Sequence, residues 1–294
     1  MSNIPLSEAV VEPKVLDIQH DTDPAQDHGP ARRIPHLGHA VLFFSLAMTA
    51  TLLSLVMVLS LAHLHDQQAV DHHPLLLLGV QALGYVLTLA AALWLFPRLW
   101  GKSFLDGIEW NALAARRWWY WVVPAGVALS AALQAVSSFL PKPPKDPVEQ
   151  LMLTHQGAWA LTVFGILMAP LIEEIAFRGF LLPALATAYD WLMLDRTPAG
   201  LQRWESSTLH SRAALIFAGV MCSVVFALFH GAQLSFLWGP MTVLFVFSLA
   251  ASYVRIRTHS VACSALLHAT YNFTIFTMLF LGTGGFHHME KLVT

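Results

Sequence analysis

Charged residues are scarce in this sequence. Aspartate, glutamate, lysine and arginine make up only 12% of its 294 residues, whereas apolar residues make up 56%. A typical soluble domain has about 25% charged residues. The composition therefore excludes an ordinary soluble enzyme and a disordered regulator, and it indicates a membrane protein.

Cysteine and an excess of positive charge are also lacking. The two cysteines, Cys222 and Cys263, lie inside apolar runs, where a free thiol behaves as a small hydrophobic group. We therefore expect free thiols and no disulfide scaffold. Acids and bases nearly balance, at 18 and 16, so nothing indicates a nucleic-acid partner. The expected partners are lipids and other molecules of the bilayer.

Long apolar runs define the fold. A helix that crosses the hydrocarbon core needs about 20 mainly apolar residues. Such runs cover residues 40–64, 74–96, 118–140, 157–189, 213–230, 237–254 and 260–283. The predicted fold is an all-α, polytopic transmembrane bundle of seven helices, or eight if a re-entrant piece is present. The fourth run is too long for one perpendicular crossing, and Pro170 and Pro183 should kink it and free backbone carbonyls.

The chain divides into four predicted regions. Residues 1–37 carry six acids and little apolar clustering, which is typical of a disordered tail. Residues 38–156 hold three spans and end in a proline-rich connection, PKPPKDP, at 141–147. Residues 157–283 hold the other four spans and nearly all the charge at membrane depth, and residues 284–294 form a C-terminal tail.

Positive charges near the span ends predict the orientation. Counted along the chain, one side carries Arg32, Arg33, Arg98, Lys102, Arg116, Arg117, Arg196, Arg203, Arg212, Arg255 and Arg257, and the other side carries Lys142, Lys145 and Lys291. Lysine and arginine concentrate in cytoplasmic loops. We therefore expect the N-terminus in the cytoplasm and, after seven crossings, the C-terminus outside.

Three charged residues lie within six positions of the fourth span, in LIEEIAFRG. Each costs about 2.5 to 3.5 kcal/mol at the centre of a membrane helix, so a functional reason is expected. Glu174 and Arg178 are four residues apart and share a helix face, so they can neutralise each other. Glu173 is turned about 100° away and needs another partner.

Two later spans repeat the four-residue spacing with polar groups that could meet Glu173. FALFH contains Phe226 and His230, and HATYN contains His268 and Asn272. One histidine alone would most often be a buried structural group, but the set has complementary chemistry. At about 1.5 Å per residue, Glu173 and His268 fall in the middle or inner part of the membrane, whereas His230 falls near the outer face. The three groups can then meet only if the fifth span is shifted, is tilted or has other boundaries.

In this order, the EExxxR, FxxxH and HxxxN motifs resemble the CAAX protease and bacteriocin-processing (CPBP, or Abi) family of intramembrane endopeptidases. YVRIRTHS, before the last span, is similar to that family's RTGS-like connection, with His259 replacing the glycine. The resemblance covers about residues 157 to 276.

The resemblance implies hydrolysis of a peptide bond in or near the membrane, in a membrane-associated and in some relatives prenylated substrate. It implies that Glu173 is the general base on a water, assisted by His230. His268 and Asn272 would then polarise the scissile carbonyl and hold its oxyanion, and Glu174 and Arg178 would support the site.

A metal-dependent mechanism remains open beside the metal-free one. Two histidines and a glutamate are the ligands of several catalytic zinc sites, so Glu173, His230 and His268 could bind Zn²⁺ while Glu174 acts as the base. The compact HExxH motif of soluble zinc proteases is absent. We favour the metal-free mechanism, without a cofactor, because Asn272 suits an oxyanion better than a metal.

Two other classes of function use the same residues. Acidic and histidine side chains at midplane depth also relay protons in transporters and channels, although the N-terminal spans contain no matching set. A non-catalytic scaffold or bacteriocin-immunity protein is the other alternative. Clustered histidines near the outer span ends (His63, His65, His72, His73, His287 and His288) are expected to be solvated loop residues.

Overall fold

The structure is a computed structural model that describes residues 33–63, 73–141 and 151–288. All regular elements in these ranges are helices, and seven helical spans are long and apolar enough to cross a membrane. The helices are α1 (Leu37–Leu61), α3 (Pro74–Trp100), α4 (Phe104–Gly107), α5 (Ala112–Ser137), α7 (His155–Val163), η1 (Phe164–Met168), α8 (Ala169–Glu174), η2 (Ile175–Leu181), α9 (Leu182–Leu192), α10 (Pro198–Ser206), α11 (Arg212–Phe229), α12 (Trp238–Thr258) and α13 (Val261–Gly282). The predicted all-α fold with seven spans is confirmed. Almost all of the predicted tail, and most of the 141–147 connection, lie outside the described residues.

Several helices begin where the sequence supplies a side-chain cap. Asn111, Ser211 and Ser260 each accept a hydrogen bond from a backbone N–H three residues later, at the starts of α5, α11 and α13. These caps satisfy amide groups that have no partner within the helix. The long apolar runs are thereby divided into separate spans.

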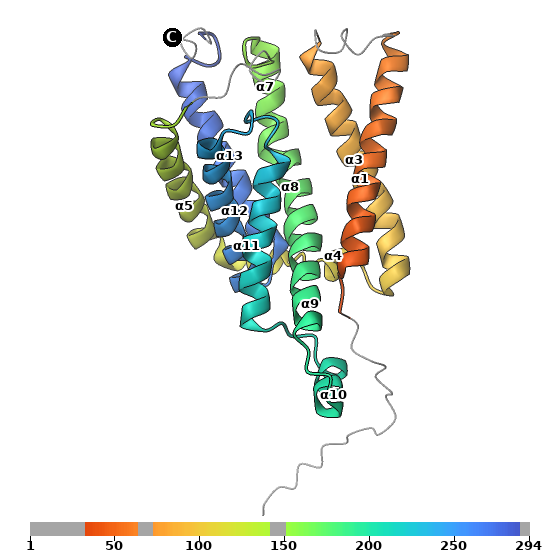
Figure 1. Ribbon diagram of the computed structural model, residues 1–294. Helices are drawn as coiled ribbons and strands as arrows, with labels where there is room; N and C mark the ends of the chain where they lie inside the picture. The colour runs from red at the N-terminus through yellow and green to blue at the C-terminus, as the bar shows by residue number, and fades with distance from the viewer. Residues whose placement is uncertain (1–32, 64–72, 142–150, 289–294) are drawn as a thin grey trace, which may run out of the picture.

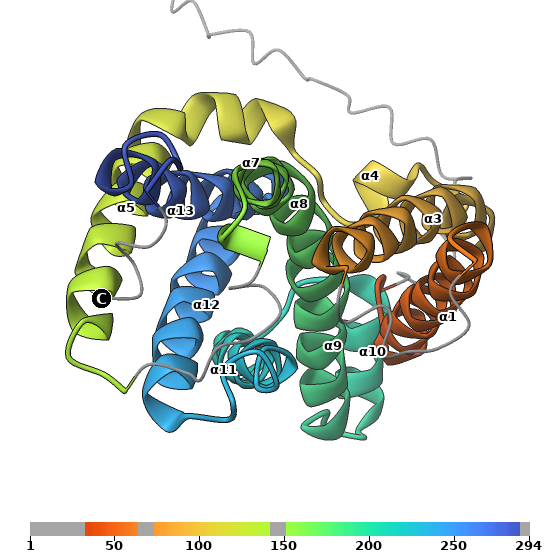
Figure 2. The ribbon, with the colours of Figure 1, turned by 90° about the horizontal axis from the view of Figure 1, so that it is seen from above.

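The first three spans lie on two sides of the molecule. Helices α1 and α3 pair with each other, whereas α5 packs against α13 (Figure 2). Glycines allow both approaches: a Cβ at Gly84 would lie 3.1 Å from Thr51 Oγ1, and one at Gly126 would lie 3.0 Å from Thr270 Cβ. The helices within residues 38–156 thus pack against the C-terminal spans on two sides.

The fourth span runs from His155 to Leu192 and contains two π-helical segments, η1 and η2. The N–H of Ala169 donates to the carbonyl of Phe164, and that of Leu182 donates to Phe177, each five residues back. The next nitrogen in each case belongs to Pro170 or Pro183, which has no hydrogen to donate. The two prolines therefore free backbone carbonyls on either side of the acidic motif, as the sequence predicts.

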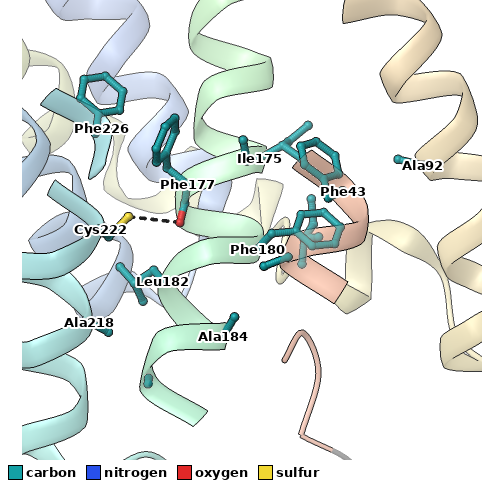
Figure 3. Close-up of a cluster of buried hydrophobic side chains, with 14 of the residues drawn as sticks. Phe43, Ala92, Ile175, Phe177, Phe180, Leu182, Ala184, Ala218, Cys222 and Phe226 are labelled. Atoms are coloured by element: carbon teal, nitrogen blue, oxygen red, sulfur yellow. Dashed lines mark hydrogen bonds between the residues drawn. The ribbon is translucent and has the colours of Figure 1, made fainter. Parts of the chain in front are cut away.

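An aromatic core joins the fourth span to α1 and α3 (Figure 3). The Phe180 ring is fully buried and stacks on Phe43, with ring centroids 4.4 Å apart, and it lies 4.7 Å from the Phe96 ring. On the other side of the span, Cys222 Sγ donates to the carbonyl of Phe177 at 3.3 Å. Cys222 and Cys263 are both free and buried, as expected. This packing holds the acidic motif between the two halves of the chain.

The described part of the C-terminal tail is packed rather than extended. Phe286 is buried, and its ring meets that of Trp159 edge to face at 5.3 Å. His287 stacks on His155 at 4.8 Å, so this histidine has a packing role beside α7. Of the other clustered histidines, His65 and His72 lie outside the described residues.

Candidate active site

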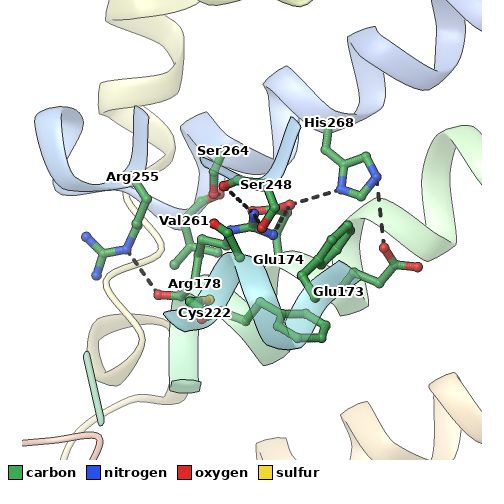
Figure 4. Close-up of polar contacts among 12 residues, drawn as sticks. Glu173, Glu174, Arg178, Cys222, Ser248, Arg255, Val261, Ser264 and His268 are labelled. Carbon is green, nitrogen blue, oxygen red and sulfur yellow. Dashed lines mark hydrogen bonds and ion pairs between the residues drawn. The ribbon is translucent and has the colours of Figure 1, made fainter. Parts of the chain in front are cut away.

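Glu174 and Arg178 form a completely buried ion pair. Arg178 Nη1 donates to Glu174 Oε1 at 2.9 Å, and both side chains are 0% exposed. Arg178 Nη2 also donates to the hydroxyl and the carbonyl of Ser248 on α12, at 2.7 and 2.8 Å (Figure 4). The predicted pairing is confirmed, and it fixes α8 and η2 against α12.

Glu173 faces both histidines. Its Oε2 lies 3.9 Å from His230 Nε2 and 3.9 Å from His268 Nε2. The three side chains are 17%, 22% and 6% exposed, respectively. Three groups from the fourth, fifth and seventh spans therefore converge at one point, as the motifs lead one to expect.

Each histidine is held through its other ring nitrogen. His268 Nδ1 lies 2.9 Å from Glu174 Oε1, and His230 Nδ1 lies 2.9 Å from the carbonyl oxygen of Phe226. Both partners are acceptors, because Glu174 is paired with Arg178 as a carboxylate. Each Nδ1 must therefore carry the hydrogen, and Nε2 is the nitrogen turned toward Glu173.

The expected position of His230 near the outer face is wrong. Helix α11 has only 18 residues and ends at Phe229, and the turn that follows lies below the upper ends of α1, α3 and α7 in Figure 1. His230 closes α11 as its C-terminal capping residue. The end of the fifth span is thus level with the acidic motif of the fourth span, which brings His230 beside Glu173.

Asn272 binds one of the carbonyls made available by proline. Its Nδ2 donates to the carbonyl of Gly165 at 2.6 Å. In the register of η1, that carbonyl would pair with the nitrogen of Pro170, which has no hydrogen. Asn272 therefore fastens α13 to the fourth span, and the second amide hydrogen of Nδ2 remains for another acceptor.

A cavity of about 230 Å³ opens onto Glu173 and His230. Its walls are mainly apolar and come from α3, the segment before α7, the fourth span and the turn after α11. The lining residues are Pro74, Leu77, Leu78, Gln81, Leu151, Leu161, Phe164, Gly165, Ala169, Glu173, His230 and Gln233. The carboxylate and the imidazole are thus accessible to a molecule that an apolar groove can hold.

Two polar residues of this cavity were not among the predicted site residues. Gln81 lines the cavity, and its Nε2 donates to the hydroxyl of Tyr85 at 3.0 Å. Gln233 lies in the turn after α11. A single glutamine within an apolar run, such as Gln81, indicates a polar contact inside the membrane. Only the packing of α3 against the fourth span shows that this glutamine lies in the same cavity as Glu173.

The three converging groups lie further apart than the ligand atoms of a bound zinc ion do. Ligand atoms at 2.0–2.2 Å from zinc lie about 3.4 Å from one another, whereas the nitrogens here lie 3.9 Å from Glu173 Oε2. No group of three histidine, cysteine, aspartate or glutamate side chains in the described ranges is arranged to hold a metal. Glu174, the base in that alternative, is fully buried and already paired.

Comparison with known families identifies the region that contains this site. Residues 155–274 match the family model described as "Type II CAAX prenyl endopeptidase Rce1-like". This part of the chain is similar to that family. The match begins with α7 and includes all six predicted site residues, and it places the chain coarsely among CAAX-type intramembrane proteases. The searches of curated proteins and of solved structures found no match.

Proposed function

We propose that this protein is an Rce1-like intramembrane endopeptidase in which Glu173 activates a water molecule. The observation that carries the proposal is the convergence of Glu173, His230 and His268, with Oε2 3.9 Å from each Nε2, beside a cavity. Groups at this separation are too far apart for a direct hydrogen bond and near enough for one water molecule to join them.

The hydrogen-bond chemistry favours water at this point. When His230 is neutral, its Nε2 and the carboxylate of Glu173 are both acceptors, because Nδ1 of His230 carries the hydrogen. Water supplies two O–H donors and keeps its lone pairs for attack. A water bound to Glu173 and His230 is therefore polarised as a nucleophile.

The proton balance of hydrolysis can be met by these groups. As the water oxygen bonds to the scissile carbonyl carbon, Glu173 takes its proton, and the carbonyl oxygen becomes an oxyanion. When the tetrahedral intermediate collapses and the C–N bond breaks, protonated Glu173 returns this proton to the leaving amine. The products are a carboxylic acid and an amine, and Glu173 is ready for another cycle.

His268 and Asn272 are proposed to stabilise the oxyanion. Protonated His268 would donate from Nε2, and buried Glu174 would stabilise its positive charge through Nδ1, as a carboxylate orients histidine in serine proteases. Asn272 has one amide hydrogen beyond the one given to Gly165. Donors fixed in a site with little water stabilise developing charge most effectively.

The substrate is proposed to be a membrane-associated or lipidated peptide or protein. The cavity walls are rich in leucine and include Phe164, with Gln81 and Gln233 as the neutral polar groups. An apolar chain segment would pack on the leucines, while the two amides could bind its peptide groups. The family description points in the same direction, since it concerns a CAAX prenyl endopeptidase.

The experiment that tests this function compares membrane peptides from cells that express the wild type, Glu173→Gln or Glu205→Gln. Glu205 is an exposed glutamate on α10 and serves as the matched control. We expect one uncut precursor to accumulate only with Glu173→Gln. If precursor levels are equal in all three strains at equal protein levels, the protein acts as a transporter or a non-catalytic scaffold, and Glu173-dependent proton flux in liposomes distinguishes those two.

Metal independence is part of the proposal and has its own test. Cleavage of the precursor by purified protein should continue after treatment with a chelator, because no step requires a metal ion. Metal content is measured on the same sample. Loss of cleavage that zinc restores would contradict the metal-free mechanism and favour the ligand set of Glu173, His230 and His268.

A further inference from the structure

A second cavity lies at the opposite ends of the helices from the candidate active site. It has a volume of about 260 Å³ and is enclosed by the starts of α9 and α11, the end of α12, the segment before α1 and four connecting segments. The lining residues are Arg33, Ile34, Lys102, Glu109, Leu182, Pro183, Thr208, Leu209, His210, Leu215, Arg255, Ile256 and His259. None of them belongs to the proposed catalytic set.

Positive charge dominates this cavity. Arg33, Lys102 and Arg255 line it, against one lining carboxylate, that of Glu109. Arg255 is only 5% exposed, and its Nη2 donates to Glu109 at 2.8 Å. With one acid against three bases, the lining has a surplus of about two positive charges when both lining histidines are neutral.

Part of this positive charge has no acceptor. Within the described ranges, no hydrogen bond or ion pair reaches Lys102, and the buried Nε of Arg33 has no hydrogen-bond partner. The terminal nitrogens of Arg33 donate to the carbonyls of Ser207 and Leu209, and its guanidinium stacks on Trp204 at 3.9 Å. Arg33 is thus held in place with its Nε–H unused.

The rest of the wall is apolar. Ile34, Leu182, Leu209, Leu215 and Ile256 line the cavity beside the bases. An inorganic anion would use only the bases, whereas an amphiphile would use both kinds of surface. The end of α12 and the start of α11 line the cavity, and these helix ends lie at the same end of the molecule as the start of α1 (Figure 1), where lipid headgroups would meet a protein embedded in a bilayer.

We propose that this cavity binds the phosphate headgroup of an anionic phospholipid, with Lys102 and Arg255 facing the phosphate and the aliphatic residues facing the start of the acyl chains. Basic pockets between transmembrane helices on the cytoplasmic side are suited to such headgroups. The site is independent of the proposed protease activity, because it needs only the arrangement of these residues.

The cavity also borders the hydrogen-bond network that holds η2 of the fourth span in place. Pro183 lines it, and the carbonyl of Arg178, which Pro183 cannot pair, accepts a hydrogen bond from Arg255 Nε at 3.3 Å. Arg178 in turn binds Glu174, which binds His268. A headgroup bound to Arg255 would therefore stabilise η2 from the side opposite the active site.

The test is a titration of lipid into detergent-purified protein, followed by native mass spectrometry. The probes are phosphatidylglycerol and phosphatidylcholine, and the variants are Lys102→Gln and Arg117→Gln. Both positions are exposed, so neither change should impair folding, and Arg117 does not line the cavity. One basic residue near a membrane surface contributes about 1 kcal/mol to anionic lipid binding, which is roughly fivefold in affinity.

We expect phosphatidylglycerol to bind the wild type and Arg117→Gln equally, and to bind Lys102→Gln about fivefold more weakly. Phosphatidylcholine binding should be the same in all three. Equal phosphatidylglycerol affinity in the wild type and Lys102→Gln would overturn the proposal. Displacement of the lipid by millimolar inorganic phosphate or glycerophosphoglycerol would overturn the lipid assignment, because a soluble anion would then be the ligand.

Discussion

The buried charges of the fourth span are each matched by a specific partner. Placing a charged side chain at the centre of a membrane helix costs about 2.5 to 3.5 kcal/mol, and Glu174 and Arg178 offset this cost by pairing at 2.9 Å. Arg178 also binds Ser248, and Glu174 also binds His268. The pair therefore joins three spans, and its loss should affect the fold as well as the site.

Replacement of Glu174 by glutamine should destabilise the protein strongly. Arg178 would be left as a buried charge without its counterion, and removal of one partner from such a pair costs about 3 to 5 kcal/mol. Thermal unfolding of the purified protein measures the effect. The double variant Glu174→Gln/Arg178→Met should be more stable than Glu174→Gln alone. If the stability lost in the double variant equals the sum of the losses in Glu174→Gln and Arg178→Met, the two side chains do not depend on each other.

Replacement of Asn272 by alanine should reduce both stability and catalysis. The carbonyl of Gly165 would lose its donor, at a cost of about 1 to 3 kcal/mol for a buried unpaired group. If the second amide hydrogen serves the oxyanion, cleavage should also slow by about 10²- to 10³-fold. Unfolding and cleavage are measured on the same preparation. A variant that loses stability and keeps full activity would limit Asn272 to its structural contact.

Sequence spacing was sufficient to predict some of these contacts and insufficient to predict others. Glu174 and Arg178 are four residues apart on one helix, so their contact follows from helix geometry. Residue types alone indicated that Glu173 would meet His230 and His268. The contact between Glu174 and His268 spans 94 positions, and no periodicity within either helix predicts it. It depends on how α8 and α13 pack.

At the scale of elements, the π-helical segments determine where the polar groups point. A change from four-residue to five-residue hydrogen bonding turns the following residues around the helix axis and exposes carbonyls. Pro170 and Pro183 predicted loosening of the fourth span, and the structure has η1 before the acidic motif and η2 directly after Glu174. The exact five-residue register was not predictable, because the apolar pattern is nearly continuous on all faces of this span.

Close packing of α5 against α13 offers a test at the same scale. A Cβ at Gly126 would lie 3.0 Å from Thr270 Cβ and 3.1 Å from the Leu267 carbonyl oxygen. Gly126→Ala should therefore force the two helices apart and lower stability by about 1 to 3 kcal/mol. At Gly79 nothing lies within 4 Å, so Gly79→Ala is the matched control and should be neutral. Equal melting temperatures for both variants would contradict this packing.

For the whole molecule, apolar length predicted the number of spans, and residue order predicted the family. The depth of each site residue in the membrane was predicted poorly, because a fixed rise per residue assumes that every span crosses the membrane from one face to the other. Helix α11 is short and ends below the upper ends of α1, α3 and α7 (Figure 1), which displaced His230 from its expected position. The roles of the individual site residues, and the orientation in the membrane, stay predictions.

The predicted orientation can be measured with single cysteines. In intact cells, a membrane-impermeant maleimide should label Lys291→Cys, on the predicted outer side, and should not label Arg117→Cys until the cells are lysed. The native cysteines, Cys222 and Cys263, are buried and should stay unlabelled. Labelling of Arg117→Cys in intact cells, with Lys291→Cys protected, would reverse the proposed topology.

The role of Glu173 is tested most directly by the rate at which purified protein in liposomes cleaves the precursor identified in membranes. We expect Glu173→Gln to lower this rate by about 10²- to 10⁴-fold, the contribution of a general base. Its melting temperature should stay close to that of the wild type, because Glu173 faces a cavity and its Oε2 lies 3.9 Å from the imidazole nitrogens, beyond direct hydrogen-bond distance. Cleavage by Glu173→Gln at the wild-type rate would contradict the account.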